Sequence, residues 1–149
     1  FFARAFTLRE KLTAVLWQFP SSFSIEPGRL ERFLVLLDRY PVWNAFEFRN
    51  DSWVNERIAG MCRARGVAMC MADWPGFLRE LPMTAGFVYL RRHGNEGNYA
   101  SSYSREVLEE DAVRIKGYLR DGLDVFIYFN NDARGHAPNN ARELMSLLR

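Results

Sequence analysis

Short apolar runs alternate with amphipathic stretches along the whole chain. Apolar runs rich in aromatic and β-branched residues predict buried strands, which we place at residues 13–19, 44–49, 67–72, 86–90 and 124–129. Between them, apolar residues recur at helical spacing. We therefore expect helices after Pro27, after residues 50–52, at about 104–121 and at about 139–148.

Strands that alternate with helices need crossover connections, and such connections produce a parallel sheet. The pattern thus predicts an α/β fold with about five parallel strands. An open doubly wound sheet and the last part of an eight-stranded barrel both remain open at this point. No glycine-rich dinucleotide or P-loop motif follows any strand. Residues 74–83, which include Pro75, Gly76 and Pro82, are predicted to form a loop.

Each predicted strand ends in polar or ionisable residues. The carboxyl ends of parallel strands lie on one edge of a sheet, and α/β folds bind their ligands there. We therefore expect the strand-end residues to form one site. These residues are Gln18, Glu47, Arg49, Asp73, Arg91, Arg92, His93, Tyr128, Asn130, Asn131 and Asp132.

Glu47 and Arg49 are two residues apart in a predicted strand, so their side chains point to the same face. One interpretation is a general acid–base carboxylate beside a guanidinium that binds an anion. The other is a structural ion pair that fills the top of a barrel. A working base would lie apart from Arg49, whereas a paired Glu47 would contribute mainly to stability.

Arg91 and His93 also share a face, and both could contact an anionic or hydroxyl-rich ligand. Asn130 and Asn131 could orient that ligand through amide hydrogen bonds, or they could be ordinary turn residues.

The strand ends and loops also contain the residue types of a metal site and of an aromatic binding surface. Glu47, Asp73 and His93 offer carboxylate and imidazole donors to a divalent metal ion. The neighbouring arginines would repel a cation, so we predict no metal site. Trp53 and Tyr103 fall in polar loops and could provide aromatic surfaces for a sugar ring or a base.

Composition narrows the range of functions only slightly. The 149 residues are 48% hydrophobic, which is enough for one domain with its own core, and the net charge of +2 does not imply a nucleic-acid or membrane surface. No apolar run reaches membrane-spanning length. Cys62 and Cys70 match no zinc or redox motif, so we expect two buried thiols and a reducing, cytoplasmic setting. The chain begins at Phe1 inside a helical pattern, which suggests a piece of a longer polypeptide.

Four motifs occur in order and together resemble the DUF72 family, also called YecE-like. They are residues 16–23 (LWQFPSSF), 46–53 (FEFRNDSW), 89–94 (YLRRHG) and 128–141 (YFNNDARGHAPNNA). The resemblance covers essentially the whole chain. It implies a single domain over residues 1–149 that is the C-terminal part of a TIM-type β/α barrel, with about the last five βα units. The family's biochemical role is not established, and a loose relationship to sugar-isomerase-like barrels has been suggested for it.

The resemblance extends to individual positions, and this chain differs from the family pattern in two respects. The matched positions are Gln18, Pro20, Glu47, Arg49, Trp53, Asp73, Arg91, His93, Tyr103, Asn130, Asn131 and Asn139. Family members carry further strands before the region that matches Thr13, and those strands would contribute ligands to an intact site. Arg92 stands where the family more often has an apolar residue.

The leading hypothesis is an enzyme, or a former enzyme, that acts on a small polar or anionic ligand, sugar-like or phosphorylated. Glu47 and His93 are the proton-transfer candidates. Its predicted ligand-binding residues are Gln18, Arg49, Trp53, Asp73, Arg91, Tyr103, Asn130 and Asn131. The alternatives are a nucleotide or nucleic-acid binding module and a scaffold without chemistry. The sequence predicts neither a cofactor nor an oligomeric state.

Overall fold

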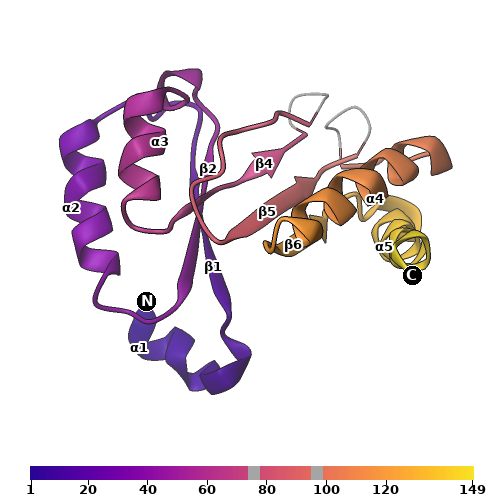
Figure 1. Cartoon of the computed structure of the whole chain (residues 1–149), viewed down its shortest axis with the longest axis horizontal. Helices are drawn as coiled ribbons and strands as arrows, with labels where there is room; N and C mark the ends of the chain where they lie inside the picture. The colour runs from indigo at the N-terminus through magenta and orange to yellow at the C-terminus, as the bar shows by residue number, and fades with distance from the viewer. Residues whose placement is uncertain (74–77, 95–98) are drawn as a thin grey trace. The chain divides into compact units, whose positions relative to one another are not determined.

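Strands and helices alternate along the chain as the hydrophobic pattern predicts (Figure 1). The computed structural model describes residues 1–73, 78–94 and 99–149. Within these ranges there are six strands and five α-helices, and every pair of neighbouring strands is parallel. The predicted α/β class with parallel strands is therefore confirmed.

The chain divides into two compact units, each with its own three-stranded sheet. The N-terminal unit comprises Phe1–Met69 and Pro82–Ala85, and the C-terminal unit comprises Cys70–Leu81 and Gly86–Arg149.

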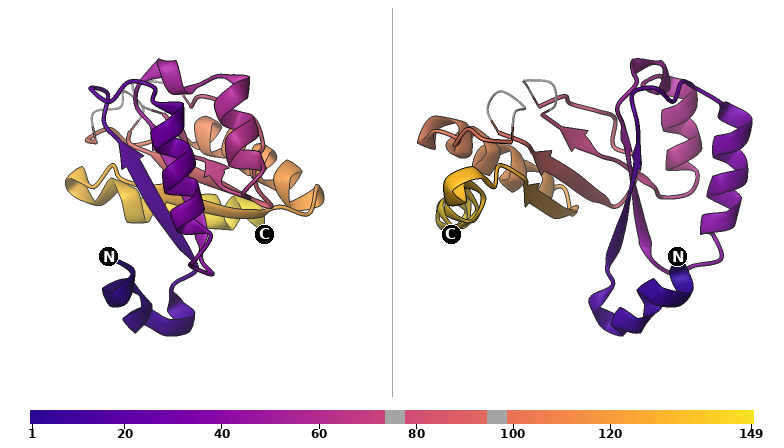
Figure 2. Two further views of the ribbon diagram at one scale, coloured as in Figure 1. Left: turned by 90° about the vertical axis from the view of Figure 1, so that its left-hand side faces the viewer. Right: turned by 180° about the vertical axis from the view of Figure 1, so that it is seen from behind.

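The sheet of the N-terminal unit has the order β1 (Ala14–Phe19), β2 (Trp43–Phe48), β3 (Ala68–Met69). Helices α2 (Pro27–Leu37) and α3 (Glu56–Arg63) lie on one side of it, and α1 (Phe2–Ala5) and the 3-10 helix η1 (Phe6–Lys11) precede β1 (Figures 1 and 2). Aromatic rings fill the space under the helices. Phe33 of α2 stacks on Phe46 of β2 at 5.7 Å and meets Trp17 of β1 edge-on at 5.0 Å.

The start of α3 differs from the sequence expectation. Residues 50–52 were expected to cap this helix, but the Asn50 side chain accepts from the Ser52 amide and starts only the 3-10 helix η2 (Asp51–Trp53). Asn55 is the cap of α3, because its side chain accepts from the amide of Ile58. Two asparagine caps in succession thus separate the strand from its helix.

The C-terminal unit has the sheet order β4 (Met71–Ala72), β5 (Phe87–Arg92), β6 (Asp124–Phe129). Ser104 caps α4 (Arg105–Arg120), and Gly122, at φ +78°, lets the chain turn back into β6. The last helix, α5 (His136–Leu148), follows the 3-10 helix η3 (Ala133–Gly135) and packs beside α4 against β6 (Figure 1).

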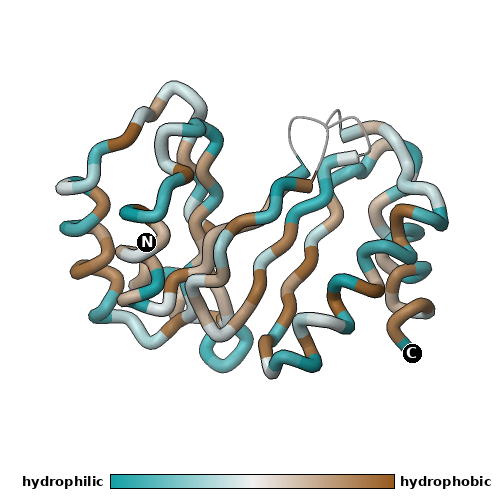
Figure 3. The backbone as a smooth tube through the Cα atoms, turned by 45° about the horizontal axis from the view of Figure 1, so that its top comes forward, coloured by the Kyte–Doolittle hydropathy of each residue, from teal (hydrophilic) through white to brown (hydrophobic). Residues whose placement is uncertain are grey.

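Helices α4 and α5 carry both hydrophilic and hydrophobic residues along their length (Figure 3). Their apolar residues pack against the sheet of the C-terminal unit and form one hydrophobic core with it. The fully packed members of this core are Met71, Val88, Leu90, Tyr103, Leu108, Ala112, Ile115 and Leu144.

The predicted third strand is divided. Residues 67–72 were expected to form one strand, but Ala68–Met69 pairs with β2 and Met71–Ala72 pairs with β5, with Cys70 between them. The predicted loop at 74–83 has neither helix nor strand over residues 78–83, and residues 74–77 lie outside the described part of the chain. Cys62 and Cys70 are free and buried, as expected.

Candidate functional site

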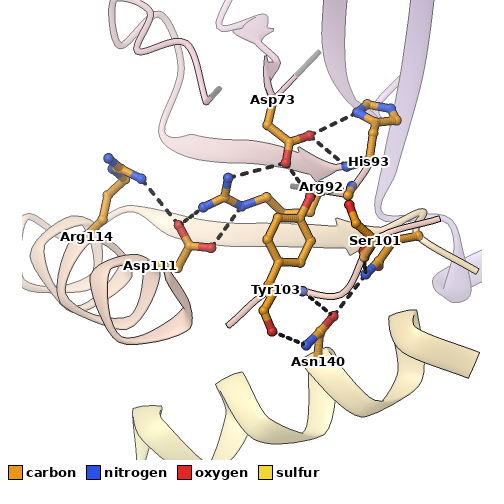
Figure 4. Close-up of polar contacts among 10 residues, drawn as sticks. Asp73, Arg92, His93, Ser101, Tyr103, Asp111, Arg114 and Asn140 are labelled. Carbon is orange, nitrogen blue, oxygen red and sulfur yellow. Dashed lines mark hydrogen bonds and ion pairs between the residues drawn. The ribbon is translucent and has the colours of Figure 1, made fainter. Parts of the chain in front are cut away.

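Asp73 and His93 come directly after two neighbouring parallel strands of the C-terminal unit, and they contact each other (Figure 4). One carboxylate oxygen of Asp73, Oδ1, accepts the backbone amide of His93 at 2.7 Å and lies 3.3 Å from Nδ1 of its ring. Both residues are buried, His93 with an exposed fraction of 0%. The other ring nitrogen, Nε2, has no hydrogen-bond partner among the described residues.

The second oxygen of Asp73, Oδ2, accepts the hydroxyl of Tyr103 and lies 3.4 Å from Nη1 of Arg92. Burial by itself would raise the pKa of Asp73. Hydrogen bonds from His93 and Tyr103, together with the charge of Arg92, outweigh it and lower that pKa below its ordinary value. Asp73 is therefore a carboxylate anion that accepts hydrogen bonds on both of its oxygens.

Tyr103, which was predicted to bind a ligand, is a buried hydrogen-bonding residue in the structure. The ring is buried in the core, and the hydroxyl accepts the Gly94 amide at 2.6 Å while it donates to Asp73. Burial is the main cause that raises the pKa of this phenol. Tyr103 therefore stays protonated and positions Asp73 and the backbone beside His93.

Arg92 and Asp111 form a buried ion pair behind Asp73 (Figure 4). Nε of Arg92 donates to Oδ2 of Asp111 at 2.8 Å, and Nη2 donates to Oδ1. Arg114, one turn along α4, lies 3.3 Å from the same Asp111 oxygen. Burial is the main cause that raises the pKa of Asp111, and the two arginines oppose it.

Sequence reasoning missed this ion pair, although the signal was present. Arg92 is the residue between Arg91 and His93 and must point to the opposite face from Arg91 in a strand. Asp111 falls among the buried positions of α4 with Leu108 and Ala112.

Asn140 holds the main chain of Tyr103 (Figure 4), and Asn131 in turn binds Asn140. Asn140 of α5 accepts from the Tyr103 amide and donates to its carbonyl, both at 3.2 Å. Asn131 donates to Oδ1 of Asn140 and to the carbonyl of Ser101, both at 2.9 Å. Asn131 was predicted to orient a ligand; it contacts the protein through Nδ2, while its buried Oδ1 has no hydrogen-bond partner among the described residues. Asn140 was not predicted.

We expect Asn140→Ala to cost about 1–3 kcal/mol of unfolding free energy, because it leaves buried backbone groups of Tyr103 without partners. Asn139→Ala is the matched control, since Asn139 is exposed in the same helix and accepts only from Arg142 among the described contacts; we expect a change within about 0.5 kcal/mol. Urea unfolding of both variants measures the difference. Equal losses for the two variants would show that Asn140 has no special role.

Arg91 lies on the other face of β5 from Arg92, and it binds Asn130 at the end of β6. Its Nε and Nη2 donate to Oδ1 of Asn130 at 3.1 and 2.8 Å. On the same face, Tyr89 stacks on Tyr128 at 5.1 Å. Because the carbonyl of the Asn130 amide accepts from Arg91, its NH₂ group points away from the guanidinium. Guanidinium and amide groups are hydrogen-bond donors of the kind that suits an anionic or oxygen-rich ligand.

In the N-terminal unit, Glu47 and Arg49 form an ion pair of 2.8 Å between Oε1 and Nε, and Glu47 is buried. The amide oxygen of Gln18, oriented by its hydrogen-bonding surroundings, accepts from Nε and Nη2 of Arg49 at 2.8 and 2.7 Å. The structure thus contains the ion pair that was one of the two interpretations of these residues.

Trp53 was expected to offer an aromatic surface in a loop, but it is part of the core. Its exposed fraction is 1%, its ring stacks on Phe48 at 5.1 Å, and its Nε1 donates to the carbonyl of Phe23 at 2.7 Å. The residue therefore holds the loops after β1 and β2 together. A sugar or base could not stack on it without displacing these neighbours.

The described residues contain neither a metal-binding cluster nor a membrane-spanning helix. No group of three or more His, Cys, Asp or Glu side chains in that part of the chain could hold a metal ion. None of the described helices is both long and apolar enough to cross a membrane.

Comparison with known proteins places this geometry in context. The family described as "Protein of unknown function DUF72" matches residues 1–149. The UPF0759 protein YunF of Bacillus subtilis is 24% identical over 93% of this chain, and the alignment spans 58% of that protein. The chain thus covers less than two thirds of the length of this curated relative.

Solved structures agree with this assignment. A DUF72 family protein of Thermotoga maritima matches with a TM-score of 0.83 and 26% identity, over 99% of this chain and 63% of that protein. A DUF72 family protein of Enterococcus faecalis matches with a TM-score of 0.79 and 19% identity, over 93% of this chain and 62% of that protein, which supports the fold alone.

Proposed function

Since this chain belongs to the DUF72 family of proteins of unknown function, we propose a role from the geometry of the strand ends. His93 is the proton acceptor of a site for a small polar or anionic ligand, and Asp73 fixes its orientation. The observation that carries this proposal is the unpartnered Nε2 of a fully buried His93 whose Nδ1 lies against a carboxylate.

The hydrogen bond to Asp73 selects one tautomer of the imidazole. A carboxylate on Nδ1 favours the proton at that nitrogen, so Nε2 carries the lone pair. When a ligand hydroxyl gives its proton to Nε2, the ring becomes an imidazolium, and the adjacent Asp73 anion stabilises the new positive charge. Tyr103 and Arg92 hold Asp73 in place for this step.

Arg91 and Asn130 are the ligand-binding residues that we assign in the C-terminal unit. Their donors suit a phosphate, a carboxylate or the hydroxyls of a sugar. Glu47 is the weaker proton-transfer candidate, because Arg49 already donates to its carboxylate at 2.8 Å. In the N-terminal unit, Gln18 and Arg49 remain candidates for ligand binding.

We also propose a fold for the longer polypeptide and a location in the cell. A TIM-type β/α barrel, to which this chain would contribute about the last five βα units, is supported by the parallel pairing and by the alternation of strands and helices. A cytoplasmic location is supported by the two free cysteines, since oxidising compartments favour disulfides.

Long-range ¹H–¹⁵N NMR of the imidazole rings tests the role of His93. We expect the Nδ1-protonated tautomer of the His93 ring. The chain has two histidines, and His136 is an internal control, since only His93 lies against a carboxylate among the described residues. Asp73→Asn should shift the tautomer of His93 and leave the His136 signals unchanged. A proton on Nε2 of His93 in the unliganded protein would contradict the proposal.

Inorganic phosphate is the first probe for the ligand class. We expect phosphate to shift the side-chain signals of Arg91, Asn130 and His93. Arg91→Gln should remove these shifts, whereas Arg134→Gln, at an exposed position of the same unit, should not. Equal responses in both variants would mean that Arg91 and Asn130 do not form the anion site.

A further inference from the structure

The outer face of α4 carries a second pattern that the site does not use. Positions three or four apart lie on one face of a helix. On α4 such a row faces away from the core, opposite the buried Leu108, Ala112 and Ile115. This row, which we call the outer row, consists of Glu106, Glu109, Glu110, Val113, Lys116, Gly117 and Arg120.

Val113 is the unusual member of the outer row. Its side chain is apolar and 70% exposed, and it separates two shallow depressions of opposite charge. The depression toward the helix N-terminus is lined by Glu80, Glu106, Glu109 and Glu110, and by Arg114 at its edge. The one toward the C-terminus is lined by Lys116, Leu119 and Arg120, and Leu119 is also 51% exposed.

The charges of the outer row are complementary to those of a second outer row that runs in the opposite direction. Glu106 and Arg120 are each seven residues from Val113, and Glu110 and Lys116 are each three residues from it. Glu109 and Gly117 are each four residues away. In an antiparallel pairing about a two-fold axis at Val113, every acid of one helix faces a base or the glycine of the other. A parallel pairing would place acid against acid.

We propose that α4 pairs antiparallel with α4 of a second copy of this chain about that axis. The two Val113 side chains meet at the centre, and the Glu110–Lys116 and Glu106–Arg120 pairs flank them on both sides. A two-fold interface uses the same surface of both copies, so that surface must be complementary to itself. The order of charges in the outer row meets this requirement. A Cβ at Gly117 would meet no heavy atom within 4 Å, so the surface there is open and leaves room for the second helix to approach.

The expected dimer is weak. One helix pair buries much less than the roughly 1,200–2,000 Å² of a stable interface. Exposed ion pairs contribute little each and are screened by salt. Two existing contacts affect the pairing. Arg105 already binds Glu109 at 2.8 Å. Lys116 donates to the carbonyl of Leu147 of α5 at 2.8 Å, and the other two N–H groups of its ammonium remain to reach a carboxylate of the second copy. Glu110 is therefore the main acidic partner.

Disulfide cross-linking of the full chain tests the axis. Val113→Cys places one thiol on each side of the two-fold axis, whereas Val35→Cys places a thiol at a valine of α2 that is 47% exposed. Cys62 and Cys70 are buried in both proteins. Under mild oxidation we expect Val113→Cys to form covalent dimers at least about tenfold faster than Val35→Cys, with the difference shrinking at high salt.

Charge reversal in the Val113→Cys background tests the register. Glu110→Lys or Lys116→Glu alone should reduce the cross-linking rate severalfold, and the two together should restore it because the reversed charges face each other again. Equal rates for Val113→Cys and Val35→Cys would overturn the proposal. A rate that ignores both single reversals, or a double variant no faster than either single one, would also overturn it.

Discussion

Arg92→Met is expected to destabilise the protein by about 3–5 kcal/mol, because it leaves the buried carboxylate of Asp111 without its main counter-charge. Asp73 also loses a cationic neighbour at 3.4 Å, although it keeps its hydrogen bonds from His93 and Tyr103. Urea or thermal unfolding measures the loss. Arg120→Met, at the exposed end of helix α4, which also carries Asp111, is the control and should change stability by less than about 0.5 kcal/mol.

The double variant Arg92→Met with Asp111→Leu separates a lost ion pair from a lost side chain. Removal of both charges replaces the pair with apolar groups, which is often close to neutral. We therefore expect the double variant to recover much of the stability that Arg92→Met loses. If the two single losses simply add, the pair is not coupled, and the buried charges are satisfied by other groups.

Trp53→Ala is expected to cost about 3–5 kcal/mol, because it empties the space of a large buried ring and removes a buried hydrogen bond. Trp53 is 1% exposed, and its ring stacks on Phe48. Trp43→Ala offers a matched control in the same unit, since Trp43 is 41% exposed, and we expect a loss below about 1 kcal/mol.

This comparison also bears on the function of Trp53. A ligand-binding tryptophan would be replaced with little loss of stability and with a loss of binding. If Trp53→Ala unfolds at the same urea concentration as Trp43→Ala, the ring is not a core element and the aromatic-platform interpretation returns.

Most elements followed from local chemistry. Pro27 begins α2, Ser104 caps α4 and Gly122 ends the turn after it, because these residues suit those backbone positions wherever they occur. The cap of α3 was misplaced by a few residues because Asn50 and Asn55 both have the right chemistry. Only the course of the chain after β2 decides which of the two begins the longer helix.

The division of the third strand could not be predicted from its residues. The run from Val67 to Ala72 is uniformly apolar and shows no break. Which neighbour each half pairs with, β2 or β5, depends on sheet register, and register is set by contacts between residues distant in sequence.

For the site, the residue types along the chain were enough to identify the polar strand ends, because parallel strands expose their carboxyl ends on one edge of a sheet whatever the loops do. The role of each residue depends on its packing and its hydrogen bonds. The observed β5 extends through Arg92, so alternation sends Arg91 toward Asn130 and Arg92 toward Asp111. Hydrogen bonding then separates the remaining candidates, all of which are buried: the polar atoms of Trp53 and Tyr103 have partners, while Nε2 of His93 is left without one among the described residues. Packing within each unit produces that difference, and a pattern of residue types along the chain does not contain it.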